Sequence, residues 1–206
     1  MLLSNIINTP SINLFVGAPR SGKSYLMKYL LIKLALEGKF KYGLVFSPSD
    51  NTFESVIPGK YLHRLYNDDK LKSFLRLQKK SKQQAFLIID DGIGSINLKT
   101  ELFKHLFTSY RHYNITIFLS VQYVYSVPPV IRQCATYVYI FKHSNQRSFE
   151  ALFLSYFSDM NNWRDVRNEM NNKLKQKYTF ILINNETGCR KVLKAPSNFN
   201  GCKLIY

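Results

Sequence analysis

The chain has 206 residues and a formal net charge of +16, from 29 Lys and Arg against 13 Asp and Glu. This length suits one α/β domain with a small extension and disfavours a two-domain enzyme. The charge favours a polyanionic partner such as DNA, RNA or an acidic lipid surface, although codon bias toward Lys and Asn gives the same excess. Three scattered cysteines, Cys134, Cys189 and Cys202, are too few for a disulfide framework or a zinc site.

The first residues lack the basic start and the long apolar core of a signal peptide. No later apolar run reaches the roughly 18 residues needed to cross a bilayer. We therefore expect an unsecreted protein in a reducing compartment, with no membrane span.

Five apolar runs alternate with helical patterns in the first two thirds of the chain. Strands are predicted at 12–16, 42–46, 85–89, 115–120 and 136–141. Helices are predicted at 24–37, over most of the basic stretch 60–84, at 98–110, and from Pro128 through Arg132. Gly38 is expected to cap the first helix. Because strands alternate with helices, the pattern predicts a mainly parallel sheet.

The end of the chain has a different pattern. Residues 148–157 and 163–175 are typical of helices, and 178–183 and 189–194 flank Asn-Asn-Glu-Thr-Gly, which is a hairpin signal. No repeat or long linker interrupts the chain. We therefore predict one domain over 1–206, with a nucleotide-binding core at 1–142 and C-terminal helices and a hairpin at 143–206 packed on it.

A complete phosphate-binding loop follows the first predicted strand. The expected ATP-binding residues are Gly17, Ala18, Pro19, Arg20, Ser21, Gly22, Lys23, Ser24 and Tyr25. The glycines let successive backbone N–H groups face the phosphates, with a helix dipole behind them. Lys23 would neutralise phosphate charge. The Ser24 hydroxyl would hold Mg²⁺, a hard cation that prefers oxygen ligands.

Polar residues also end the other predicted strands. Asp90 and Asp91 follow the third strand, and next to a phosphate loop Asp90 is expected to orient Mg²⁺ while Asp91 polarises the attacking water. A simple turn is the alternative. Gln122 ends the fourth strand, where it is expected to sense the γ-phosphate and hold the water, unless it is an ordinary strand-end residue. The cluster 47–51 forms a loop after the second strand, where active-site loops belong.

Two arginines, Arg111 and Arg132, are candidates for a catalytic charge inserted from a neighbouring subunit. Such an arginine accelerates phosphoryl transfer by about 10³ to 10⁵. Arg111 also suits a helix C-terminus electrostatically, and Arg132 could equally be solvated. The basic residues of 60–84 are likewise either a solvated helix face or a DNA-facing one.

The stretch 111–122, Arg-His-Tyr-Asn-Ile-Thr-Ile-Phe-Leu-Ser-Val-Gln, and the trailing Val-Pro-Pro-Val-Ile-Arg at 127–132 carry a more specific signal. Together with the phosphate loop and 87–91, they resemble the viral DNA-packaging ATPases, the vaccinia-like branch of the FtsK and HerA superfamily. The resemblance runs from residue 13 to about 142, and more weakly to 183. Asp91 is an acceptable variant of the second acidic position of that family.

The resemblance implies a P-loop NTPase fold with sheet order 5-1-4-3-2, numbering the five predicted strands along the chain. It also implies a homo-oligomeric ring, a pentamer or hexamer, that uses ATP and Mg²⁺ to move double-stranded DNA into a preformed capsid. The implied partners are a viral capsid or portal vertex. The implied location is the host-cell cytoplasm or an intracellular virus assembly site.

Two other functions use the same loop. A P-loop nucleotide kinase needs an arginine-rich lid, and no convincing lid is found in the sequence. An ATP-switched DNA-binding protein without translocation would tolerate loss of Asp91 or Gln122, both of which are present. A GTPase is disfavoured because no Asn-Lys-x-Asp motif occurs.

Overall fold

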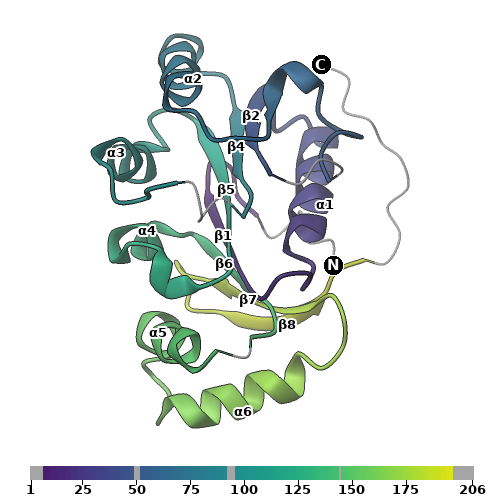
Figure 1. Ribbon diagram of the computed structural model, residues 1–206, viewed down its shortest axis with the longest axis vertical. Helices are drawn as coiled ribbons and strands as arrows, with labels where there is room; N and C mark the ends of the chain where they lie inside the picture. The colour runs from purple at the N-terminus through teal and green to yellow at the C-terminus, as the bar shows by residue number, and fades with distance from the viewer. Residues whose placement is uncertain (1–6, 49–51, 92–95, 144, 197–206) are drawn as a thin grey trace.

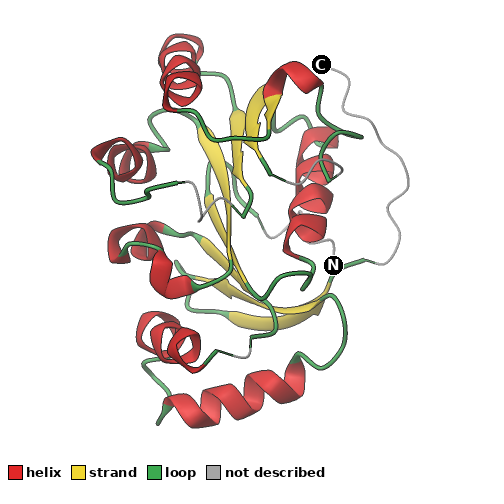
Figure 2. Cartoon of the chain, viewed as in Figure 1, coloured by secondary structure: helices red, strands yellow, loops and turns green. Residues whose placement is uncertain are grey.

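The computed structural model describes residues 7–48, 52–91, 96–143 and 145–196, which form one eight-stranded sheet with helices on both faces (Figures 1 and 2). The strand order is β3-β2-β4-β5-β1-β6-β7-β8. The strands are β1 Ile12–Val16, β2 Tyr42–Phe46, β3 Leu62–His63, β4 Ala85–Ile89, β5 Ile115–Val121, β6 Tyr137–Ile140, β7 Thr179–Asn184 and β8 Arg190–Lys194.

The five predicted strands are β1, β2, β4, β5 and β6, and all their pairings are parallel. Their order, β6-β1-β5-β4-β2, confirms the predicted order 5-1-4-3-2. β7 pairs antiparallel with both β6 and β8, so the predicted hairpin is also confirmed. The hairpin extends the parallel sheet at its β6 side.

The helix predicted over most of the stretch 60–84 is present, but it does not include the first residues of that stretch. A short 3-10 helix, η2 Gly59–Tyr61, leads into β3, which adds two residues to the edge of β2. Helix α2 Asp68–Ser81 begins only after Asn67, whose side-chain oxygen accepts a hydrogen bond from the Lys70 backbone N at 2.9 Å. That side-chain cap satisfies one of the unpaired N–H groups of the first turn and sets the start of the helix.

The helices lie on two sides of the sheet. Helix α1 Lys23–Leu36 covers one face, and α2 to α6 lie along the other (Figure 1). The remaining helices are α3 Glu101–Ser109, η4 Val124–Ser126, α4 Pro129–Cys134, α5 Gln146–Tyr156 and α6 Trp163–Lys173. Among the described residues, no helix combines the length and apolarity needed to cross a membrane.

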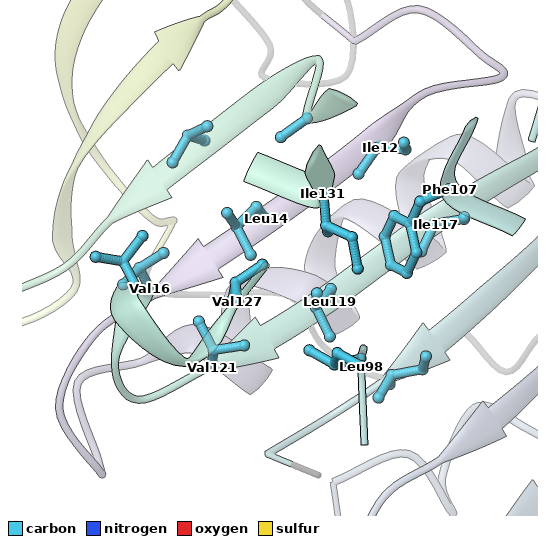
Figure 3. Packing of buried hydrophobic residues seen from close by; sticks show 14 of the residues in the cluster. Ile12, Leu14, Val16, Leu98, Phe107, Ile117, Leu119, Val121, Val127 and Ile131 are labelled. Carbon is cyan, nitrogen blue, oxygen red and sulfur yellow. The ribbon is translucent and has the colours of Figure 1, made fainter. Parts of the chain in front are cut away.

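The central strands are buried on both faces, which explains why they read as continuous apolar runs. All seven residues of β5 are buried. On one face, Leu14 of β1 and Leu119 of β5 pack beneath Val127 and Ile131 (Figure 3). On the other face, the Phe118 side chain belongs to the cluster formed with α1. These two apolar layers hold the ends of β1, β4 and β5 in a fixed arrangement.

Gly38 ends α1 as predicted. Its φ of +73° is in the left-handed region, its N–H donates to Ala35 O at 2.9 Å, and the next N–H donates to Leu34 O at 2.9 Å. This pair of bonds is a Schellman motif, in which a glycine avoids the steric cost of a Cβ.

Candidate active site

The candidate site lies at the carboxyl ends of β1, β5 and β4, which are neighbours in the sheet. The phosphate loop leaves β1, Gln122 follows β5, and Asp90 and Asp91 follow β4. Crevices outside the carboxyl ends of parallel strands are the usual ligand sites of open α/β sheets. The sheet order therefore brings together three motifs that are far apart in the sequence.

Backbone hydrogen bonds tie the phosphate loop to both neighbouring strands. The Gly17 N–H donates to Val121 O at 3.2 Å, and the Ala18 N–H donates to Lys142 O at 3.2 Å. A Cβ on Gly17 would lie 2.6 Å from the Cβ of Phe141, so a side chain there would displace the end of β6. Gly22, with φ of +105°, turns the chain into α1. The glycines thus give the loop its curl.

Lys23 lies inside this curl. Only 6% of the residue is exposed, and Nζ donates to Gly17 O at 2.8 Å and to Ala18 O at 3.1 Å. Burial lowers the pKa of Lys23, while the charges of Asp91 and Asp90 act in the opposite direction. The Lys23 ammonium is therefore held by the loop that is predicted to bind phosphates, and it is subject to the charges of the two carboxylates that follow β4.

Asp90, which directly follows β4, connects this strand to the phosphate loop. Its Oδ1 accepts a hydrogen bond from Ser24 Oγ at 3.0 Å, and its Oδ2 accepts one from Ser47 Oγ at 3.3 Å. Asp90 is 2% exposed, and burial raises its pKa, against the hydrogen bond from Ser24. Ser47 follows β2 and lies in the loop predicted at this end of the sheet, but its contact with Asp90 was not predicted.

Asp91 pairs with Gln122. The Gln122 side-chain Nε2 donates to Asp91 Oδ2 at 3.1 Å. The other carboxylate oxygen, Oδ1, is buried and has no hydrogen-bond partner among the residues that the structure describes. Asp91 has a φ of +47°, a conformation uncommon for a residue with a side chain and one that recurs at functional sites. The arrangement leaves one carboxylate oxygen able to accept a hydrogen bond.

The oxygen atoms here suit Mg²⁺. Ser24 Oγ and Asp90 Oδ1 are hard ligands already in contact, at 3.0 Å. The described part of the chain contains no group of three or more His, Cys, Asp or Glu side chains that could hold a metal ion by themselves. Mg²⁺ commonly binds through one or two protein oxygens together with substrate phosphates, so the residues fit this ion.

The two candidate arginines lie away from this site, toward the amino ends of the strands. Arg111 precedes β5, and its guanidinium donates to Tyr110 Oη at 2.9 Å and forms a 2.9 Å ion pair with Glu186, in the turn between β7 and β8. Arg132 lies on α4, where Nη1 donates to Ser155 Oγ at 2.6 Å. They line two cavities that share Gln133 and Asn185. The structure does not bring them to the phosphate loop of the same chain.

The other predicted nucleotide-binding residues lie on the exposed part of the loop and in the first turn of α1. Pro19 and Arg20 are exposed at the tip of the loop, and Ser21 is half-buried. Tyr25 lies in the first turn of α1, where its hydroxyl donates to Pro196 O at 2.7 Å and its ring centroid is 5.1 Å from that of Tyr178. The Tyr25 hydroxyl therefore contacts the C-terminal segment.

Comparison with known proteins gives a family and several relatives. The family described as "Poxvirus A32 protein" matches residues 4–194. Protein 075L of Invertebrate iridescent virus 6 is 26% identical over 152 residues, which are 68% of this chain and 58% of that protein. Protein 015R of Frog virus 3 is 25% identical over 141 residues, 63% of this chain and 43% of that protein. The chain thus spans about half the length of these two relatives.

Solved structures show the same fold. The genome packaging NTPase B204 of Sulfolobus turreted icosahedral virus 2, in complex with AMP, has a TM-score of 0.68 at 20% identity, over 91% of this chain and 98% of that one. The cytoplasmic domain of the type VII secretion ATPase EccC of Thermomonospora curvata has a TM-score of 0.59 at 15% identity, over 90% of this chain and 25% of that one. The predicted P-loop fold with a C-terminal hairpin is therefore confirmed.

Proposed function

This chain belongs to the poxvirus A32 protein family, and we propose that it is an ATPase that moves double-stranded viral DNA into a preformed capsid. One arrangement carries the ATPase part of the proposal: the 3.0 Å hydrogen bond from Ser24 to Asp90, together with the 3.1 Å hydrogen bond from Gln122 to Asp91 at the adjoining strand ends. These contacts join the phosphate loop, the two aspartates after β4 and the carboxyl end of β5 into one site. Its parts match what phosphoryl transfer to water requires.

Residues 17–25 would bind ATP, most of them through the loop backbone. The Lys23 ammonium, which donates to two loop carbonyls, would turn toward the β- and γ-phosphates. Ser24 and Asp90 would hold Mg²⁺ together with phosphate oxygens. When bound, Mg²⁺ supplies positive charge that stabilises the transferring phosphoryl group.

Hydrolysis would use Asp91 and Gln122. A water bound to the free Oδ1 of Asp91 would attack the γ-phosphorus while the bond to the bridging oxygen of ADP breaks. Asp91 would accept the proton that this water loses. The amide of Gln122 is bonded to the same carboxylate, so it would orient Asp91 and report whether the γ-phosphate is present.

A ring of identical subunits would complete the site. Arg111 and Arg132 lie toward the opposite ends of the strands from the phosphate loop, so the one that acts would serve the loop of a neighbour. The ion pair between Arg111 and Glu186 is solvent-exposed on both sides, and such pairs contribute only about 0.2–1 kcal/mol. Arg111 could therefore exchange this partner for a phosphate at small cost.

DNA would bind to basic surfaces of the ring. Helix α2 buries Leu71 and Phe74 and exposes its basic side chains. The exposed set is Lys70, Lys72, Arg76, Lys79 and Lys80, followed by Lys82. If about six such contacts form, the slope of log K against log salt would be about −5. A viral capsid or portal would be the further partner, at an intracellular assembly site in the host.

The test is steady-state ATP hydrolysis with and without double-stranded DNA at low salt. DNA should raise the rate, Lys23→Ala should abolish it, and Lys39→Ala, which removes an exposed charge beyond the far end of α1, should leave it unchanged. A rate that DNA does not raise would count against a translocase. Transfer of the phosphoryl group to a nucleotide would identify a kinase, and ATP-dependent DNA binding without turnover would identify a switch.

A further inference from the structure

Two tyrosines and an arginine gather on the surface at the edge of the sheet where the strands β5 and β6 end. Tyr123 directly follows Gln122, and Tyr125 lies in η4; their ring centroids are 5.3 Å apart, with an interplanar angle of 16°. Arg147 lies in the first turn of α5, and its Cζ is 4.6 Å from the centroid of the Tyr125 ring. We call these three side chains the tyrosine–arginine cluster.

The turn that carries the two tyrosines is held firmly on the core. Val124 and Val127 are buried in the apolar layer on this face of the sheet. The Ser126 N–H donates to Tyr123 O at 3.2 Å, and the Val127 N–H donates to Val124 O at 3.1 Å. Tyr123, with 38% of its surface exposed, is therefore a large aromatic residue presented to solvent on a fixed turn.

Arg147 is an exposed positive charge that the chain leaves available. Among the residues that the structure describes, no carboxylate forms an ion pair with it. Glu150, the first acidic residue after Arg147, accepts a hydrogen bond from Gln146 Nε2 at 2.9 Å. The neighbour that orients the guanidinium is the Tyr125 ring, because arginine stacks on aromatic faces and keeps its N–H groups available at the edge of its plane. Such a fork of donors matches the oxygens of a phosphate.

We propose that the tyrosine–arginine cluster contacts the sugar-phosphate backbone of double-stranded DNA, and that DNA acts on the ATPase site through this contact. The proposal rests on the proposed function, because it assigns a surface to the DNA of that function. Arg147 would bind a phosphate with two N–H groups, and the tyrosine hydroxyls would donate to neighbouring phosphate oxygens. Contacts of this kind do not depend on base sequence, which suits a partner that is moved along its whole length.

Charge and packing favour a DNA backbone over other partners. The net charge of +16 attracts a polyanion more strongly than it attracts a typical protein surface. The Tyr125 ring already has Tyr123 and Arg147 against it, so an unpaired base would have to break one of these contacts in order to stack. The hydroxyls and the guanidinium, by contrast, can donate to phosphates while the cluster stays as it is.

The cluster is joined to the catalytic residues by a single peptide bond. Gln122 Nε2 donates to Asp91 Oδ2 at 3.1 Å, and the next residue along the chain is Tyr123. A peptide group is planar and stiff, so a change in the backbone at Tyr123 alters the orientation of Gln122. DNA bound to the cluster would thus change the position of the amide that orients Asp91, and with it the rate of hydrolysis.

The first test measures binding of a fluorescent DNA duplex to the full chain by anisotropy at several salt concentrations. Arg147→Gln should reduce the magnitude of the slope of log K against log salt by about one, because one phosphate contact is lost. Tyr123→Ala removes a neutral group, so it should weaken binding about two- to ten-fold and leave the slope unchanged. Lys33→Gln is the matched control. Lys33 also lies over a tyrosine ring, 5.9 Å from the Tyr29 centroid, but on α1 at the opposite face of the sheet, and its loss should change neither quantity (Figure 1).

The second test is the ratio of the ATP hydrolysis rate with duplex DNA to the rate without it. This ratio should fall toward one in Arg147→Gln and in Tyr123→Ala, and it should keep its unaltered value in Lys33→Gln. Arg147→Gln replaces an exposed side chain, so it tests the contact even if Tyr123→Ala disturbs the turn. Light scattering of each variant records whether it assembles like the unaltered chain.

Three outcomes separate the possibilities. If Arg147→Gln and Tyr123→Ala keep the affinity, the salt slope and the rate ratio of the unaltered chain, the cluster does not contact DNA, while the proposed ATPase stands. If both variants lose the rate ratio and also fail to assemble, the cluster is a contact between copies of the chain, and the proposal is overturned. If DNA does not raise the rate of the unaltered chain, the proposed function fails as well.

Discussion

The neutral, buried state of His143 predicts how the stability of the protein depends on pH. Burial lowers the pKa of His143 from 6.5 to about 4 in the folded chain. Between these values the unfolded chain binds more protons than the folded one, so the free energy of unfolding falls as pH falls. A difference of about 2.5 pKa units corresponds to about 3 kcal/mol in the free energy of unfolding. This contribution is fully present above pH 6.5 and is lost by pH 4. About 2 kcal/mol should already be lost at pH 5.

The measurement is urea unfolding of the unaltered chain and of His143→Phe at several pH values from 7.5 to 4.5. Other groups also titrate, including Asp90, whose pKa burial raises. Their contributions should largely cancel in the difference between the two proteins. That difference should shift by about 2 kcal/mol in favour of His143→Phe between pH 7.5 and 5. A difference that stays constant over this range would show that His143 is not held neutral by the fold, and the reasoning would be refuted.

Three further predictions concern turnover, assembly and folding. Asp91→Asn should bind ATP and Mg²⁺ normally but hydrolyse ATP about 10²–10⁴-fold more slowly, as measured by binding and steady-state assays; normal turnover would remove its assigned role. Arg111→Ala subunits mixed with Lys23→Ala subunits should recover activity that neither variant has alone if Arg111 acts in trans, and no recovery at any ratio counts against that role. Gly38→Ala should lower the free energy of unfolding by about 1 kcal/mol, measured in urea, because its φ is +73°; an unchanged midpoint would contradict the strain.

Much of the fold could be predicted because the central strands are buried on both faces. Such strands appear in the sequence as uninterrupted apolar runs, and their alternation with helices predicts a parallel sheet. β3 could not be predicted in the same way. It has two residues, Leu62 and His63, both half-buried, and it exists only because the edge of β2 is available for pairing. No periodicity can be detected in so short a segment.

The candidate residues could be proposed from the sequence where each belongs to a motif that directly follows a predicted strand. The phosphate loop, the pair Asp90 and Asp91, and Gln122 each follow the carboxyl end of a strand. Parallel pairing of the three strands brings those carboxyl ends together. Ser47 could not be assigned from the sequence, because its relevance depends on a contact between segments distant in the chain. The Ser47 hydroxyl meets Asp90 only because β2 pairs with β4.

If Arg111 acts in trans as proposed, its position determines how many catalytic centres in an assembly are complete. A contact between Arg111 of one copy and the phosphate loop of the next is heterologous, since each copy offers a different surface to each neighbour. With the arginine supplied in trans, an open row of subunits always contains one loop without a donor and one donor without a loop. Closure of the row into a circle removes both unmatched ends at once. Only closure of the ring, and no earlier step of assembly, would then give every phosphate loop its arginine.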